Sequence, residues 1–227
     1  MKICILLPAY NEEKSLGALL KSVRPYGLDA VVIDDGSADA TSEIARQGGA
    51  ILLRHAGNQG KGQALRTGFH YAVERGYDAV LIMDADGQHD PQEIPAFCAC
   101  AEKTRAGIVI GNRMHCPTGM PLVRKLTNWL TSFFISRLTD RPIPDTQCGY
   151  RLLRTDLLKK MHLSTNNYDT ESEILIEAAR HHEHIESIPI RSIYRDHKSQ
   201  IHPVRDTVRF WMLMIRKLLR REPSRPR

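Results

Sequence analysis

Residues 79–88 read AVLIMDADGQ, a short apolar run followed at once by two aspartates and a glycine. A run of this length that ends in polar residues is typical of a strand buried on both faces. Four other runs rich in Ile, Val and Leu share this form, at 3–7, 30–33, 50–53 and 107–110. Helical patterns alternate with them, at 13–23, 39–48, 61–75 and 91–103. Repeated strand-helix-strand units predict an α/β fold with a mainly parallel, Rossmann-like sheet and helices on both faces.

The second half of the chain breaks this rhythm. After a loop at 115–121, the pattern predicts a long helix at 122–138, and we expect its aromatic residues to face the core. The remaining expected elements are a strand, a helix, a strand and a basic helix, at 149–154, 170–181, 185–190 and 203–227. The chain length favours one large domain with a short appendage, so we expect a domain at 1–202 and a helical tail at 203–227.

The composition excludes several classes of protein. With 42% hydrophobic and 26% charged residues, the chain is neither disordered nor collagen-like. Its longest apolar run, Phe210 to Ile215, is far shorter than the roughly 18 residues of a membrane span. The apolar stretch at the N-terminus ends at Pro8 without a small-residue cleavage site, so we expect a cytoplasmic protein. The five cysteines contain no C-x-x-C pair, which argues against a structural zinc site.

The net charge of +6 comes from the C-terminal tail. Residues 203–227 contain eight of the 32 basic residues and two of the 26 acidic ones, so the rest of the chain balances at 24 against 24. Apolar residues from Val204 to Leu219 recur at helical spacing, with arginines on the other face. A basic amphipathic helix of this kind either packs on its own domain or lies on an anionic membrane surface, and both interpretations stay open.

Polar clusters follow four of the predicted strands, at 8–12, 34–37, 84–88 and 111–113. Because the carboxyl ends of parallel strands meet at one edge of a sheet, where ligands bind, we expect these clusters to lie together. Asp84 and Asp86 project from the same side of an extended chain. Two convergent carboxylates favour a cation that prefers hard oxygen ligands, Mg²⁺ or Mn²⁺, and such a cation in turn binds diphosphate.

A glycine-rich segment, Gly57 to Gly62, follows the third strand and opens a helix. Free backbone N–H groups at such a place can bind an anion. The spacing matches neither the P-loop nor the dinucleotide-binding pattern, so a functional and a purely structural role are equally supported at this point.

Six short motifs, each weak by itself, occur in one order along the chain. They are Pro8-x-Tyr10-Asn11-Glu12, Asp34-Asp35-Gly36-Ser37-x-Asp39-x-Thr41, Asn58-x-Gly60-Lys61-Gly62, Asp84-x-Asp86, Gly111-x-Arg113 and Asp145-Thr146-Gln147-Cys148-Gly149-Tyr150-Arg151. From residue 3 to about 210 the chain thereby resembles family 2 inverting glycosyltransferases, and most of all the dolichyl- and polyprenyl-phosphate sugar synthases. The resemblance implies a GT-A fold and transfer of a sugar from a nucleotide diphosphate to a lipid phosphate. It also implies that the helix at 122–138 borders the lipid site.

The resemblance further implies roles for single residues. The nucleotide sugar would be bound by Pro8, Tyr10, Glu12, Ile33, Asp35, Asp84 and Ala85, and the metal by Asp84, Asp86 and Gln88. Arg113 and Arg124 would approach the diphosphate and the acceptor phosphate, where a guanidinium binds oxygens bidentately. Arg195 would be a second diphosphate-binding arginine. Lys198 is a substitute candidate, because the position of the family's usual lysine holds Gln200.

The expected catalytic residues are Asp86, Arg113 and Asp145, and two acceptors remain open. An acceptor phosphate is already anionic, whereas an acceptor hydroxyl needs a general base, for which Asp145 is the natural candidate. The preferred hypothesis is metal-dependent, inverting transfer to polyprenyl phosphate by a protein bound peripherally to the inner face of the cell membrane. The alternative is transfer to a hydroxyl of a cell-envelope saccharide or other small acceptor.

Two hypotheses from other classes are less favoured. A regulator that binds nucleotide sugars without turnover is disfavoured by the complete set of carboxylates. A nucleic-acid-binding module has little support, because the positive charge is confined to one tail and only 6% of the residues are aromatic.

Overall fold

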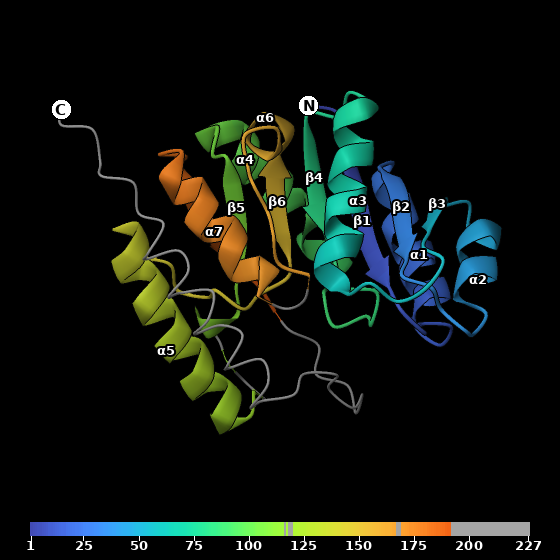
Figure 1. Ribbon diagram of the computed structural model, residues 1–227, viewed down its shortest axis with the longest axis horizontal. Coiled ribbons are helices and arrows are strands. Elements are labelled where there is room, and N and C mark those ends of the chain that lie inside the picture. Colours follow the sequence, from blue (N-terminus) through green and yellow to red (C-terminus); the bar gives the residue numbers. More distant parts are fainter. Residues whose placement is uncertain (116, 118–119, 167–168, 192–227) are drawn as a thin grey trace.

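The computed structural model describes residues 1–115, 117, 120–166 and 169–191. Within them lies a seven-stranded sheet with the order β3-β2-β1-β4-β6-β5-β7 (Figure 1). The strands are β1 Ile3–Ala9, β2 Asp29–Asp34, β3 Ile51–Arg54, β4 Ala79–Ile82, β5 Ile108–Asn112, β6 Arg151–Arg154 and β7 Ile185–Pro189. All seven strands lie where the sequence predicts them. The expected helical tail at 203–227 lies outside the described residues.

One strand, β6, departs from the parallel arrangement of its described neighbours. It pairs antiparallel with β4 on one side and with β5 on the other, whereas the remaining pairings are parallel. Its first residue, Arg151, is opposite Ile82, the last residue of β4. The segment that precedes β6 therefore lies at the edge of the sheet where β1, β2, β4 and β5 end.

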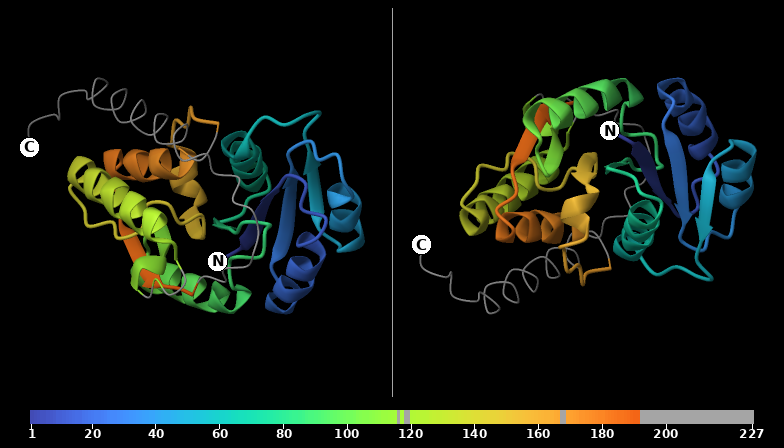
Figure 2. Two further views of the ribbon diagram at one scale, coloured as in Figure 1. Left: turned by 90° about the horizontal axis from the view of Figure 1, so that it is seen from below. Right: turned by 90° about the horizontal axis from the view of Figure 1, so that it is seen from above.

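Helices cover both faces of the sheet. They are α1 Leu16–Val23, α2 Thr41–Gln47, α3 Lys61–Glu74, α4 Ile94–Thr104, α5 Leu122–Thr139, α6 Thr155–Leu158 and α7 Thr170–Arg180, with 3-10 turns η1 Arg24–Tyr26, η2 Pro91–Glu93 and η3 Arg113–His115. Figure 2 shows α3 and α7 on one face and α1 and α4 on the other, with α5 packed outside α7. Among the described helices, none combines the length and the apolarity needed to cross a bilayer. Residues of the central strands, such as Leu6 and Leu81, are fully buried, as expected for strands covered on both faces.

The orientation of α5 differs from the expectation that its aromatic residues face the core. Apart from Arg137, its exposed side chains are apolar: Leu122, Val123, Leu126, Trp129, Leu130 and Phe133. Its buried side chains are mostly polar: Asn128, Thr131, Ser132 and Ile135. The polar stripe is buried because it finds hydrogen-bond partners, such as the Thr146 hydroxyl 3.0 Å from that of Thr131.

Candidate active site

The four polar clusters lie together at one edge of the sheet, as the sequence predicts. β1, β2 and β4 are mutually parallel, and β5 has the same direction because the antiparallel β6 separates it from β4. The loops above this edge are tightly packed. Gly36 has a φ of +76°, and a Cβ there would lie 2.5 Å from the backbone of Gly57, so the loops after β2 and β3 touch directly.

The predicted nucleoside-binding residues lie at the ends of β1 and β2. Pro8, Tyr10 and Glu12 are partly exposed, and Pro8 is paired in register with Ile33. The Ile33 side chain is fully buried in the core. Any contact from Ile33 to a nucleoside would therefore come from its backbone.

Asp35 is buried and holds the glycine-rich loop. Its Oδ1 atom accepts the backbone N–H of Gln59 at 2.9 Å, and its Oδ2 atom accepts that of Gly60 at 2.8 Å. The His55 Nδ1 atom lies 2.7 Å from the same Oδ1, and its Nε2 atom lies 2.9 Å from the hydroxyl of Thr67 on α3. Asp35 thus fixes the loop that starts α3, a structural role in addition to its expected contact with the nucleotide sugar.

Asp84, just after β4, belongs to a row of charged groups. The Lys61 Nζ atom lies 2.6 Å from Asp84 Oδ1 and 2.8 Å from Glu171 Oε1, so one ammonium group joins two carboxylates. Burial by itself raises the pKa of Asp84, but the charge and hydrogen bond of Lys61, together with other nearby charges, outweigh burial and lower that pKa to about 2. Burial likewise opposes the charge on Lys61, yet the two carboxylates raise its pKa above the usual value. Asp84 and Lys61 are therefore both charged at physiological pH.

Two glycines make this contact possible. A Cβ on Gly149 would lie 3.0 Å from Asp84 Oδ2 and 3.1 Å from Lys61 Nζ. A Cβ on Gly62 would lie 2.1 Å from the Thr170 hydroxyl, because the first turn of α3 packs against the segment before α7. The glycine-rich segment therefore has a structural role in close packing, and its lysine is part of the site.

His89 supports the turn that carries Asp84 and Asp86. Its Nδ1 atom accepts the backbone N–H of Asp84 at 3.0 Å, and its ring stacks on Tyr150 with centroids 4.9 Å apart. Burial lowers the pKa of His89, although the charge of Asp84 opposes the shift. A neutral imidazole with Nδ1 as acceptor carries its proton on Nε2, which faces Asp84 Oδ2 at 3.7 Å.

The residues expected to bind a metal suit a hard cation. Asp84 and Asp86 follow β4 on one turn, and Asp86 Oδ1 accepts the backbone N–H of Gln88 at 2.9 Å. Within the described part of the chain, no group of three or more His, Cys, Asp or Glu side chains is arranged as a metal centre. Two carboxylates fit Mg²⁺ or Mn²⁺ if a diphosphate and water supply the other ligands, as Mg²⁺ sites commonly require.

Arg113 and Asp145 form a buried ion pair at the end of β5. Asp145 Oδ2 accepts from Arg113 Nε at 2.8 Å and from its backbone N–H at 3.0 Å, while Oδ1 accepts from Nη2 at 2.9 Å. Asn128 of α5 donates to Oδ1 at 2.8 Å. Burial alone would raise the pKa of Asp145, but the hydrogen bonds and charge of Arg113 lower it. Arg124, one turn before Asn128, lies on the same side of α5.

The Arg113 pair and the Asp84 row belong to one site. The loop before β6 connects them, because Asp145 pairs with Arg113 and a Cβ on Gly149 would lie 3.0 Å from Asp84 Oδ2. Arg151 links the surrounding loops: it is fully buried and donates to the backbone carbonyls of Cys148, Glu171 and Thr146 at 2.7, 2.5 and 2.7 Å. One guanidinium thus joins the loop before β6 to the first turn of α7.

Sequence reasoning did not identify four residues of this site: Lys61, His89, Asn128 and Glu171. Lys61 belongs to the motif Asn58-x-Gly60-Lys61-Gly62, whereas Glu171 has no signal in the sequence, because only the structure shows that its position on α7 is buried. Arg195 and Lys198, expected at the diphosphate, lie outside the described residues. The structure brings the other predicted residues to one edge of the sheet, and their roles remain predictions.

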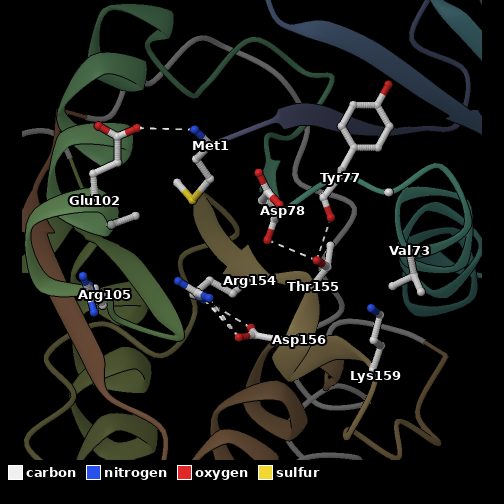
Figure 3. A pocket seen from close by; sticks show the side chains of 12 residues that line it. Met1, Val73, Tyr77, Asp78, Glu102, Arg105, Arg154, Thr155, Asp156 and Lys159 are labelled. Atoms are coloured by element: carbon white, nitrogen blue, oxygen red, sulfur yellow. Dashed lines mark hydrogen bonds and ion pairs between the residues drawn. The ribbon is translucent and has the colours of Figure 1, made fainter.

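A separate cavity of about 520 Å³ lies near the opposite edge of the sheet (Figure 3). Met1, Asp78 and Thr155 line it, together with the exposed pair Arg154 and Asp156. It contains none of the residues predicted to bind nucleotide sugar, metal or acceptor.

Comparison with known proteins identifies relatives of this chain. The chain is 31% identical over 218 residues to a UDP-N-acetylglucosamine–dolichyl-phosphate N-acetylglucosaminyltransferase of Methanococcus voltae, covering 86% of this chain and 87% of the relative. It is 30% identical over 210 residues to an undecaprenyl-phosphate mannosyltransferase of Micrococcus luteus, covering 86% and 85%.

A solved structure confirms the GT-A fold. Glucosyl-3-phosphoglycerate synthase from Mycobacterium tuberculosis, in complex with Mn²⁺ and UDP-glucose, matches with a TM-score of 0.74 at 20% identity, covering 96% of this chain and 78% of that one. The family model for glycosyl transferase family 2 matches residues 4–161. The chain therefore belongs to glycosyl transferase family 2 and is a glycosyltransferase that uses a nucleotide sugar.

Proposed function

We propose that this enzyme transfers a sugar, with inversion and with Mg²⁺ or Mn²⁺, from a nucleotide-diphosphate sugar to polyprenyl phosphate at the cytoplasmic face of the membrane. The observation that supports the proposal is that the two sides of α5 have different contacts. One side of this helix binds the Arg113–Asp145 pair through Asn128, and the other exposes six large apolar side chains. The names of the relatives from Methanococcus voltae and Micrococcus luteus support a lipid-phosphate acceptor.

The donor would bind across the carboxyl ends of β1, β2 and β4. Pro8, Tyr10 and Glu12 are placed to hold the nucleoside, and Asp84 and Asp86 to hold the cation. When bound, the cation would neutralise charge that develops on the departing diphosphate. Lys61 and Arg113 add fixed positive charge beside the position proposed for the diphosphate.

The state of Asp145 favours an acceptor that is already anionic. Both of its oxygens accept hydrogen bonds, and its lowered pKa makes it a weak base. A general base must reach the proton that it removes and have a pKa near the working pH. Asp145 instead orients Arg113, so the acceptor in this proposal is a phosphate and needs no deprotonation.

The exposed face of α5 fits an anionic bilayer. Trp129 is 58% exposed and Phe133 47% exposed, and the sequence from 122 to 139 contains Arg124, Lys125 and Arg137 but no Asp or Glu. Aromatic and basic side chains together are typical of helices that lie in a membrane interface. Docking by this face would bring α5, and with it the Arg113–Asp145 pair that Asn128 contacts, to the surface where lipid phosphates lie. We propose residues 203–227, which lie outside the described residues, as a second membrane contact.

The test is a transfer assay with purified enzyme, Mn²⁺, a panel of nucleotide sugars and a short polyprenyl phosphate. Thermal shift with nucleotide diphosphates and Mn²⁺ selects the base beforehand. The matched polyprenol, which has a hydroxyl in place of the phosphate, is the control acceptor. We expect transfer to the phosphate only, an inverted anomeric configuration by NMR, and loss of activity in EDTA. Transfer to saccharide hydroxyls but to no polyprenyl phosphate would contradict the proposal.

A further inference from the structure

The ammonium group of Lys61 contacts an oxygen that is also a candidate metal ligand. Lys61 Nζ lies 2.6 Å from Asp84 Oδ1 and 2.8 Å from Glu171 Oε1. Asp86, the second carboxylate on the turn, accepts a backbone N–H and is partly exposed. The two aspartates that are expected to bind the metal therefore have different surroundings.

Several fixed contacts hold Lys61 in this position. Asp35 accepts hydrogen bonds from the N–H groups of Gln59 and Gly60, the two residues that precede Lys61. Gly62, the residue after it, donates its N–H to the carbonyl of Asn166 at 2.9 Å. The Lys61 side chain is only 17% exposed. Lys61 is therefore part of the built site and not a mobile surface lysine.

A cation bound to Asp84 would compete with Lys61. Mg²⁺ lies about 2.0–2.1 Å from its oxygen ligands, so an ion on Asp84 would stand close to the ammonium group, and the two positive charges would repel. Glu171 is a second carboxylate partner of Lys61, so the charge of Lys61 would remain paired if Lys61 moved away from Asp84. The negative charge of a diphosphate attracts both the cation and Lys61.

We propose that Lys61 acts as an internal competitor of the metal ion at Asp84, so that the ion binds tightly only together with the diphosphate of the donor. The inference rests on the metal-dependent function proposed above. In this arrangement Lys61 is a positioning residue: it holds Asp84 in place, and it releases the Asp84 oxygen to the cation when a diphosphate binds. Glu171 retains Lys61 near the site during the exchange.

The test measures binding of Mn²⁺ alone, without nucleotide or acceptor, by the EPR signal of the free ion. Lys61→Met should lower the dissociation constant of Mn²⁺ at least tenfold relative to the wild type. Lys159→Met, which removes the same charge from an exposed position at the separate cavity, is the matched control and should change nothing. An unchanged Mn²⁺ affinity in folded Lys61→Met would overturn the proposal.

A double-mutant cycle separates competition from a general effect of charge. Glu171→Gln leaves Lys61 with Asp84 as its carboxylate partner, so this variant should bind Mn²⁺ more weakly than the wild type. In the Lys61→Met background the same substitution should have no effect, because the competitor is absent. Equal effects in both backgrounds would refute the proposal.

Glu171→Gln also covers the case in which Lys61→Met does not fold, since unchanged Mn²⁺ binding by the Glu171 variant alone would refute the mechanism. Circular dichroism and thermal melts check the fold of each variant. The binding assay contains neither donor nor acceptor, so its outcome is independent of the transfer assay that tests the proposed function.

Discussion

Replacing Asp145 by asparagine changes the charge and hydrogen bonding of one buried side chain and hardly changes its size. In the wild type, Asp145 is 0% exposed and accepts three hydrogen bonds from Arg113 and one from Asn128. The amide nitrogen of an asparagine would face N–H groups that point toward it. Arg113 would lose its partner and remain only 18% exposed.

The expected loss of stability follows from this geometry. Breaking one side of a buried ion pair costs about 3–5 kcal/mol. For a protein of this size, 1 kcal/mol corresponds to roughly 2–4 °C in Tm, so we expect Tm to fall by roughly 6 °C or more. Because the folded pKa of Asp145 is lowered, its contribution is complete above the unfolded value of about 4 and is lost as the pH falls through the folded pKa. The difference in free energy of unfolding between the wild type and Asp145→Asn should therefore become smaller at acid pH.

Urea unfolding at pH 7 and at lower pH measures both effects. Asp156→Asn is the matched control: Asp156 pairs with Arg154 at 2.9 Å but is 56% exposed, and such surface pairs contribute about 1 kcal/mol or less. In the transfer assay, Asp145→Asn should reduce turnover modestly through the loss of Arg113 positioning. A loss of about 10²- to 10⁴-fold with unchanged stability would instead identify Asp145 as a general base and refute the reasoning.

Three further predictions test other parts of the site. Asp86→Asn should weaken Mn²⁺-dependent binding of nucleotide diphosphate at least tenfold by calorimetry while leaving Tm unchanged; equal affinity would remove Asp86 from the metal site. Gly62→Ala places a Cβ 2.1 Å from the Thr170 hydroxyl and should cost about 1–3 kcal/mol in urea unfolding, whereas Gly57→Ala, whose Cβ meets nothing within 4 Å, should cost far less. In sedimentation with anionic liposomes, Trp129→Ser with Phe133→Ser should reduce binding at every salt concentration, and replacing Arg216, Lys217, Arg220 and Arg221 by Gln should reduce it mainly at low salt; wild type left in the supernatant at low salt would contradict both.

The sequence predicted the elements and the edge of the sheet where the site lies, because both follow from local patterns. Apolar runs such as 79–83 identify strands, and the direction of parallel strands brings their polar ends together. The family motifs then selected Asp84 and Arg113. All of these inferences depend on residues close together in the sequence.

The partners of these residues were not predictable in the same way. Lys61 and Glu171 are far apart in the sequence and meet only because α3 and the start of α7 pack together. In α5 the sequence contains an apolar and a polar stripe, and the usual rule buries the apolar one. Hydrogen bonds from Asn128 and Thr131 to the segment before β6 reverse that rule. Periodicity alone gives no information on such bonds.

The position of β6 between β4 and β5 has a consequence for folding. Residues 79–112 contain both flanking strands, but neither can complete its pairing until residues 151–154 arrive from far along the chain. We expect such distant pairings to form late, because long loops must close first. Until then β4 and β5 have open edges, which are prone to pair with other chains. Insertion of β6 closes both edges and, in the same step, brings Asp145 to Arg113 and Gly149 to Asp84. The active site is thus assembled by the event that completes the sheet, and a chain that stops short of β6 has only half a site.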